Sequence, residues 1–232
     1  FSVSIIPFSL KAVCISCAYS SGVLVNGGGL ESAPVNLSDG VFSLEFYAKN
    51  DAGLFSTAQR NASVDTQPPT LFPSVPAATG AHGWHIANVQ IGIASSDATS
   101  GVDYDGIIVD GSNRSNPTIL SEGVYSIEFF ATDNAGLQSL AQQTISVDTT
   151  DPLLSLQKTG TQGEGGWYLS EVDIQAQYSD GLSGIDTIFY KIGSGAWMSG
   201  DHLSVGEGVS SVSFELTDIA GNQVILSETI RD

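Results

Sequence analysis

Apolar and polar residues alternate along most of the chain with a period of two. Val89, Ile91 and Ile93 alternate with polar neighbours, and residues 172–176 show the same pattern. Such alternation indicates half-buried β-strands, because successive side chains of a strand face opposite sides of the sheet. No stretch keeps a period of 3.6 over the length of a helix. The pattern therefore predicts an all-β protein.

The strand pattern is part of a longer internal repeat. "EFYAKNDAGL", which starts at residue 45, returns 83 residues later as "EFFATDNAGL", and "VDT" at 64–66 also returns after 83 residues. A looser version, "FELTDIAGN", occurs at residues 214–222. Repetition at a fixed period indicates structural units of similar fold. We expect a first copy at 1–64, a second at 65–147 and a third at 148–232.

Each full copy has room for about seven short strands separated by Gly and Asp turns, which is typical of an antiparallel β-sandwich. In the third copy the expected strands lie near 153–157, 167–178, 185–192, 195–199, 202–206, 209–217 and 222–231. The first copy is shorter, and aligning Leu10 with Val89 leaves it without its first strand. An unpaired sheet edge can accept a strand from another molecule, so self-assembly into a filament or lattice is one expectation.

Several short phrases occur at fixed places in the copies: G-W-Y, D-x-x-S-G, E-G and D-x-A-G-N, joined by V-D-T-x-x-P. The third copy carries all of them and the second copy most of them. In these phrases the chain resembles the immunoglobulin-like repeats of large bacterial surface and secreted proteins. The resemblance implies three tandem immunoglobulin-like antiparallel β-sandwiches in an elongated array, the first lacking its N-terminal strand. Such repeats act as spacers, stalks or adhesive arrays at the cell surface.

The charge balance restricts the possible partners. Acidic residues number 25 against 7 basic ones, which gives a formal net charge of -18. This charge disfavours nucleic acid and anionic membranes and favours cations or basic surfaces. No apolar run approaches the roughly 20 residues of a membrane span, so we expect no direct membrane insertion. With 41% hydrophobic residues the chain can still bury real cores.

Acidic residues are expected to converge where one copy meets the next. In a sandwich of this topology, the loop between the second and third strands and the loop between the sixth and seventh strands lie at the same end as the incoming linker. The turn between the fifth and sixth strands of the preceding copy faces that end. At the first junction the candidates are Asp39, Asp65, Asp97 and Asp133. At the second junction they are Glu122, Asp148, Asp151, Asp180 and Asp218. Calcium suits such oxygen-rich groups, and calcium-stiffened cadherin-type repeats offer a precedent by analogy.

A second interpretation of the same acids needs no metal. An Asp at the start of a turn accepts hydrogen bonds from backbone groups two residues on, which suits both D-x-x-S-G and D-N-A-G. In the first copy, which has no preceding linker, Asp97 aligns with Ala18 and Asp133 with Asn50. A junction ligand would be needed only where a junction exists, whereas a turn cap would be needed in every copy. Both interpretations stay open at this point.

Other candidate chemistry is sparse. Cys14 and Cys17 form a CxxC pair without the second pair that a zinc site needs, so we expect a buried residue and a free thiol. His82 and His85 have no counterparts in the third copy and are expected at a solvent-exposed strand edge, and His202 is isolated in the sequence. No nucleophile elbow, phosphate-binding loop or HExxH motif occurs. We therefore expect no enzymatic activity.

The sequence as a whole predicts a structural or adhesive rod segment of an exported cell-surface protein, with copies of itself or other surface proteins as partners. The alternative is a carbohydrate-binding or spacer module of a secreted hydrolase, since the three tryptophans could stack on sugars. Glycans are then the partner. Sequons for N-glycosylation occur at Asn36, Asn61 and Asn113.

Overall fold

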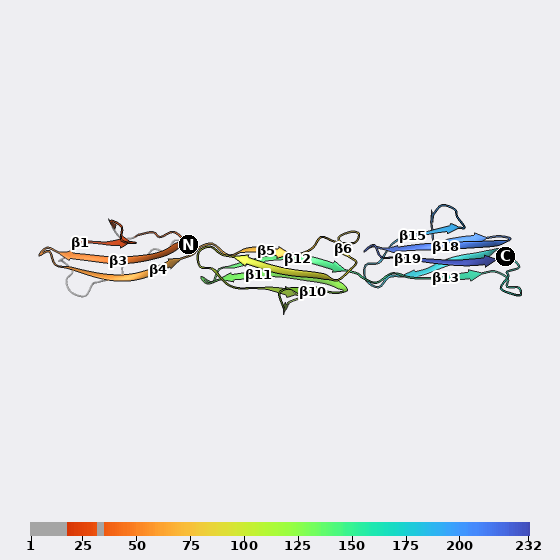
Figure 1. Ribbon diagram of the computed structural model, residues 1–232, viewed down its shortest axis with the longest axis horizontal. Helices are drawn as coiled ribbons and strands as arrows, with labels where there is room; N and C mark the ends of the chain where they lie inside the picture. Colours follow the sequence, from red (N-terminus) through yellow and green to blue (C-terminus); the bar gives the residue numbers. More distant parts are fainter. Residues whose placement is uncertain (1–17, 32–34) are drawn as a thin grey trace. The chain divides into compact units, whose positions relative to one another are not determined.

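The structure is a computed structural model that describes residues 18–31 and 35–232 (Figure 1). Over these ranges the chain forms 19 strands and no helix. Consequently, no helix of the described ranges is long and apolar enough to cross a membrane. The predicted fold class, all-β with tandem immunoglobulin-like antiparallel sandwiches, is confirmed by the strand pairing set out below. Residues 1–17, which include Cys14, Cys17 and the region of the expected missing strand, lie outside the described ranges.

The first copy contributes one described sheet, with order β2-β1-β3-β4. Its strands are β1 (Ala18–Val25), β2 (Leu30–Glu31), β3 (Gly40–Asn50) and β4 (Phe55–Val64). Neighbouring strands pair antiparallel, and the β3–β4 hairpin runs in unbroken register from Gly40–Val64 to Lys49–Phe55. Val23 on β1, Leu44 on β3 and Val64 at the end of β4 are buried.

The second copy forms two sheets, with orders β10-β7-β5 and β6-β12-β11-β8-β9. Its strands are β5 (Thr70–Ser74), β6 (Trp84–His85), β7 (Val89–Ser96), β8 (Val102–Val109), β9 (Ser112–Arg114), β10 (Thr118–Leu120), β11 (Gly123–Asp133) and β12 (Gln138–Val147). As the alternation predicts, Val89, Ile91 and Ile93 are buried while Gln90 is exposed. The short β6 differs from the other strands because it pairs parallel with β12.

The third copy repeats this arrangement, with sheets β13-β14-β17 and β16-β15-β18-β19. Its strands are β13 (Leu153–Thr159), β14 (Val172–Ser179), β15 (Ile185–Ile192), β16 (Met198–Ser199), β17 (His202–Val205), β18 (Val209–Asp218) and β19 (Gln223–Arg231). Five of the expected strands coincide closely with these, and the strand expected at 195–199 is reduced to Met198–Ser199. The strand expected at 167–178 begins only at Val172, because the segment before it leaves the sheet and forms an isolated bridge at Tyr168.

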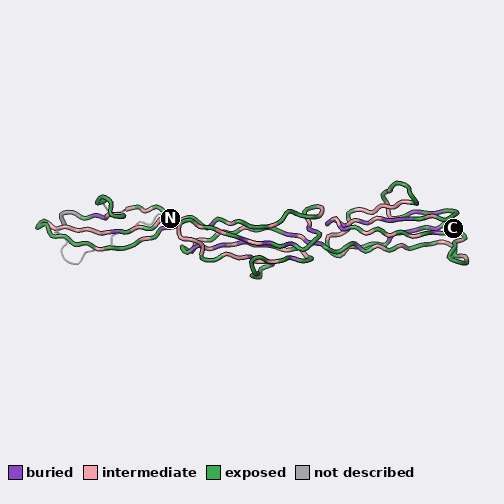
Figure 2. The backbone as a smooth tube through the Cα atoms, viewed as in Figure 1, coloured by how far each residue is buried: buried purple, intermediate pink, exposed green. Residues whose placement is uncertain are grey.

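The core of the third copy lies between its two sheets. Phe214 on β18 is fully buried and packs with Val172, Ile174 and Val212, among others. Figure 2 marks the buried segments of the backbone in purple. The ring of Tyr190 on β15 lies 6.0 Å from the ring of Phe214, centroid to centroid. This packing fixes β14 and β18, the two strands that end at acidic residues of the candidate site.

By packing, the chain divides into two compact units. Unit 1 comprises the described residues up to Phe72 together with Ala94–Gly106 and Phe129–Ala141. Unit 2 comprises Pro73–Ile93, Ile107–Glu128 and Gln142–Asp232. The boundaries 1–64, 65–147 and 148–232 stay a prediction from the repeats, and each group of residues below lies within one unit.

Candidate functional site

Two groups of three aspartates draw together at the linkers. The first cluster is Asp65, Asp97 and Asp133, and the second cluster is Asp148, Asp180 and Asp218. In each cluster, one carboxylate oxygen from every member lies within 4.8 Å of those of the other two. Each cluster takes one residue from the linker, one from the position just after β7 or β14, and one from the end of β11 or β18. The predicted convergence of these six residues is what the structure shows.

In the first cluster, backbone groups hold the linker aspartate and the aspartate that follows β7. Asp97 Oδ1 accepts hydrogen bonds from the N–H groups of Thr99, Ser100 and Gly101 at 3.1, 2.9 and 2.9 Å. Asp65 Oδ2 accepts a bond from the same Ser100 N–H at 3.0 Å, and its Oδ1 accepts one from Gln67 N–H at 3.1 Å. Hydrogen bonding by Ser100 lowers the pKa of Asp65 below its ordinary value, against the opposing effect of burial. Asp65 therefore ties the linker to the β7–β8 loop.

Asp133 is the most buried member of the first cluster, with 1% of its surface exposed. Its Oδ1 accepts hydrogen bonds from Ala135 N–H at 2.9 Å and from Leu137 N–H at 2.8 Å. Gly136 has a φ of 87°, which this tight turn requires and which glycine adopts without strain. Asp133 Oδ2, in contrast, is buried and has no hydrogen-bond partner.

In the second cluster the linker residue Asp148 is fully buried. Its Oδ1 accepts a hydrogen bond from Thr150 N–H at 3.2 Å and its Oδ2 one from Ser183 N–H at 3.0 Å. Asp180 Oδ2 accepts bonds from Gly184 N–H and Leu182 N–H at 2.7 and 2.9 Å. Burial raises the pKa of Asp180, but these backbone N–H groups outweigh it, so the pKa lies below its ordinary value.

Asp218 closes the second cluster and has partners on both oxygens. Oδ1 accepts hydrogen bonds from Gly221 N–H at 2.7 Å and Asn222 N–H at 2.8 Å. Oδ2 accepts a bond at 2.8 Å from the side-chain amide of Asn222. The same amide nitrogen also donates to the carbonyl oxygen of Asp148 at 3.1 Å. Asn222 thus joins the β18–β19 turn to the linker, a role that sequence reasoning did not assign to it.

Three of the predicted ligands belong to neither cluster. Asp39 accepts hydrogen bonds from the hydroxyl of Thr66, at 2.9 Å to Oδ1 and 3.1 Å to Oδ2. Glu122 Oε2 accepts bonds from the hydroxyls of Thr149 and Thr150 at 2.9 and 2.5 Å, which together lower the pKa of Glu122. Asp151 is exposed. The turn before the sixth strand thus contacts threonines of the linker, and it offers no ligand to a cluster.

The turn-capping interpretation is confirmed by these bonds, because every cluster aspartate accepts backbone N–H groups from its own turn or from the linker. The first copy supports it too: Asn50 Oδ1 accepts a hydrogen bond from Leu54 N–H at 2.9 Å, as Asp133 does from Leu137. Capping does not exclude a cation, since a carboxylate has about four lone-pair sites.

The first cluster fits a hard cation. Two oxygens bound to one Ca²⁺ at 2.3–2.6 Å can be at most about 5 Å apart, and the three carboxylates satisfy this limit. Asp133 Oδ2 is a buried carboxylate oxygen without a donor, and leaving such an oxygen unmatched is unfavourable. Asp65, Asp97 and Asp133 would hold the ion.

Within unit 2, the turn after β18 also meets residues 80–82 of the second copy. Ala81 N–H donates to the carbonyl oxygen of Ala220 at 2.7 Å, and His82 Nδ1 lies 3.0 Å from the carbonyl oxygen of Ile219. The prediction that His82 and His85 lie at a solvent-exposed strand edge is wrong for His85, because only 5% of its surface is exposed. Parallel pairing with β12 draws His85 in, and its carbonyl accepts a bond from Asp148 N–H at 2.8 Å.

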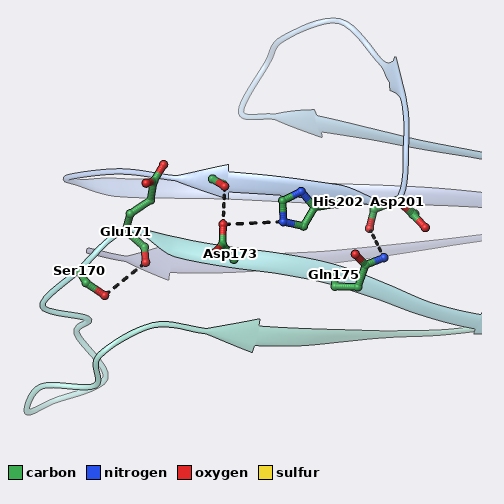
Figure 3. Close-up of polar contacts among 7 residues, drawn as sticks. Ser170, Glu171, Asp173, Gln175, Asp201 and His202 are labelled. Atoms are coloured by element: carbon green, nitrogen blue, oxygen red, sulfur yellow. Dashed lines mark hydrogen bonds and ion pairs between the residues drawn. The ribbon is translucent and has the colours of Figure 1, made fainter.

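A third group of polar residues lies on the outer face of β14 and β17 (Figure 3). His202 Nε2 lies 3.7 Å from Oδ1 of Asp173, so His202 is not isolated in space. The hydroxyl of Ser204 donates to the same oxygen of Asp173. Serine and histidine both contact the carboxylate and not each other, which differs from a nucleophilic triad, where histidine lies between the other two.

The remaining candidates are surface features. Asn36, Asn61 and Asn113 are all exposed. Trp167 is 45% exposed, whereas the ring of Trp197 carries Lys191 Nζ at 4.4 Å from its centroid.

No family model and no curated protein matches the chain. Among solved structures, the chain is similar to the fibronectin(III)-like modules of Clostridium thermocellum CbhA, at 14% identity over 69% of this chain and 93% of the other, with a TM-score of 0.35. It is also similar to the protocadherin fragment PcdhgB3 EC1-4, at 12% identity over 91% of this chain and 64% of the other, with a TM-score of 0.40. A third is SGBP-B of Bacteroides ovatus in complex with a mixed-linkage heptasaccharide, at 14% identity over 93% and 60%, with a TM-score of 0.19. The fold assignment rests on the strand pairing described above.

Proposed function

We propose that the chain is a non-enzymatic structural segment of an exported cell-surface protein, in which tandem sandwiches carry load or present an adhesive surface. The observation that carries this proposal is the double attachment of each linker. The linker aspartate bonds to the loop of the copy that follows, as in Asp65 to Ser100 N–H and Asp148 to Ser183 N–H. The linker threonine bonds to the copy that precedes, as in Thr66 to Asp39.

Such attachments are what a spacer needs and what a flexible tether lacks. A linker rich in free polar residues samples many conformations, whereas each of these linkers has side-chain bonds to both neighbours over a few residues. Pro68, Pro69 and Pro152 restrict the backbone further. The array is therefore proposed to resist bending at its joints.

Calcium at the acidic clusters is part of the proposal. The candidate ligand atoms in each cluster are carboxylate oxygens, which hard cations prefer. The net charge of -18 also favours the binding of cations. A cation shared by a linker aspartate and two loop aspartates would tighten the same attachment that the hydrogen bonds make. The partners proposed are copies of the same chain or other surface proteins.

The test is backbone NMR relaxation of the intact chain. We expect order parameters near 0.85, the value of rigid backbone, for residues 65–67 and 148–151, equal to those of the flanking strands. Values below about 0.6 at the linkers, with rigid strands on either side, would contradict the proposal. The strands serve as the internal control.

The alternative, a carbohydrate-binding module, draws on the half-exposed Trp167. A glycan array separates the two functions. Binding that is lost in Trp167→Ala and kept in Trp197→Ala would favour the carbohydrate module, because Lys191 Nζ already lies over one face of the Trp197 ring.

A further inference from the structure

The two clusters differ in the residue four positions after the aspartate that ends β11 or β18. The second copy reads D-N-A-G-L from Asp133 to Leu137, and the third reads D-I-A-G-N from Asp218 to Asn222. The backbones match: Leu137 N–H and Asn222 N–H each donate to Oδ1 of their aspartate, both at 2.8 Å. The side chain at this position is leucine in the second copy and asparagine in the third.

That difference decides whether the second carboxylate oxygen has a partner. In the third copy the Asn222 amide donates to Asp218 Oδ2. The side chain of Leu137 carries no hydrogen-bond donor, and Asp133 Oδ2 is left buried without a partner. Over the described residues, only one other buried side-chain oxygen or nitrogen, Thr132 Oγ1, shares this condition.

The third copy also shows where the oxygen in question points. The amide nitrogen of Asn222 reaches Asp218 Oδ2 and the carbonyl oxygen of Asp148 together, so it lies between the sixth-strand aspartate and the linker. The corresponding place in the second copy lies between Asp133 and Asp65. A positive group at that place would face Asp133 Oδ2, which has no other partner. One carboxylate oxygen each of Asp65, Asp97 and Asp133 lies within 4.8 Å of the others, close enough for the three residues to share one ion.

We propose that the first cluster binds one divalent cation of the calcium type, held by Asp65, Asp97 and Asp133, and that in the second cluster the amide of Asn222 takes the place of that cation. This inference rests on the calcium binding proposed above and assigns it to one cluster. The chain then binds one calcium ion, and residue 137 or 222 determines the occupancy of each cluster.

Three carboxylates without a counter-charge repel one another strongly at such distances. In the second cluster the oxygens of Asp148, Asp180 and Asp218 are met by backbone N–H groups and by the Asn222 amide, the one side-chain donor among them. In the first cluster the hydroxyl of Ser100 lies 3.5 Å from Asp97 Oδ1, and no side-chain donor reaches Asp133 Oδ2. Ca²⁺ tolerates an irregular oxygen shell completed by water, whereas Mg²⁺ requires a near-ideal octahedron, so calcium is the better fit.

The experiment is calorimetric titration of the intact, chelator-treated chain with CaCl₂, with MgCl₂ as the control ion. Wild type is expected to bind one Ca²⁺. Leu137→Asn supplies the missing amide and is expected to weaken that binding at least tenfold, while its melting temperature in chelator stays equal to wild type or rises. Asn222→Leu removes the amide and is expected to raise the stoichiometry to two.

Each result has a distinct meaning. Two ions bound to wild type, or one ion whose binding survives Leu137→Asn, would overturn the inference and leave calcium binding by the array intact. No binding to wild type at millimolar CaCl₂ would overturn both the inference and the calcium part of the proposed function. If Leu137→Asn does not fold, Asp133→Asn is the second variant, because it keeps the Oδ1 cap and removes the charged oxygen.

Discussion

The hydroxyl of Thr66 donates to the carboxylate of Asp39, at 2.9 Å from Oδ1 and 3.1 Å from Oδ2. Asp39 precedes β3 and Thr66 lies in the linker after β4, so one bond fastens the end of the sheet to the start of the joint. Glu122 with Thr149 and Thr150 makes the same connection 83 residues later. The repetition indicates that the connection is a feature of the joint.

Removing the hydroxyl should loosen the first joint. Thr66→Val keeps the shape of the side chain and removes its donor, and we expect a loss of about 0.5–1.5 kcal/mol in the free energy of unfolding. Chemical denaturation measures it. Thr66→Ser, which restores a hydroxyl, is the matched control, and an equal loss in both variants would show that the hydrogen bond is not responsible.

Glu122 should make the second joint sensitive to acid. The two threonines lower the pKa of Glu122 from its ordinary value of 4.5, so the folded state holds a proton there less well than the unfolded state. The resulting stability is fully present above pH 4.5 and is lost as the pH falls through the lowered pKa. Glu122→Gln is expected to reduce this acid-dependent part of the unfolding curve, measured by denaturation from pH 6 to about pH 3. A pH profile identical to wild type would count against it.

Asp97 should stabilise its loop chiefly by accepting hydrogen bonds. Asp97→Ala leaves the N–H groups of Thr99, Ser100 and Gly101 without their acceptor, and a loss of about 1–3 kcal/mol is expected. Asp97→Asn keeps a carbonyl oxygen and should lose much less. Both are measured in chelator, where the cation makes no contribution. Equal losses would indicate that the charge, and not the acceptor, is what matters.

Gly136 and Gly221 occupy equivalent turns and form a matched pair. Both have positive φ, 87° and 101°, so alanine at either position should cost about 1–2 kcal/mol from backbone strain. A Cβ at Gly136 meets no atom within 4 Å, whereas at Gly221 it would lie 3.3 Å from the backbone nitrogen of Ala81. Gly221→Ala should therefore lose more, and hydrogen exchange of the Ala81 amide should accelerate only in that variant. Equal exchange in the two variants would refute the contact.

Much of the candidate site could be predicted from the sequence, because the repeats fix which residues are equivalent and the topology fixes which loops share an end. Asp65, Asp97 and Asp133 came from this reasoning alone. The hydrogen bonds of Asp39 and Glu122 could not be predicted in this way. Both residues lie in the expected turn, but each accepts from a threonine 27 or 28 positions away. The role of Asn222 was also hidden, because Asn in a turn has many local uses and the choice depends on a carbonyl 74 positions distant.

The parallel pair of β6 and β12 has a mechanical consequence. Ser146 and Val147 run alongside Trp84 and His85 in the same direction, and in the third copy Tyr168 N–H donates to the carbonyl oxygen of Arg231 at the equivalent place. Tension that reaches β6 from upstream and β12 from downstream acts along these strands, so their hydrogen bonds are sheared together and not peeled apart one at a time. The second and third copies are thereby closed at the point where a pull along the chain would otherwise begin to open them.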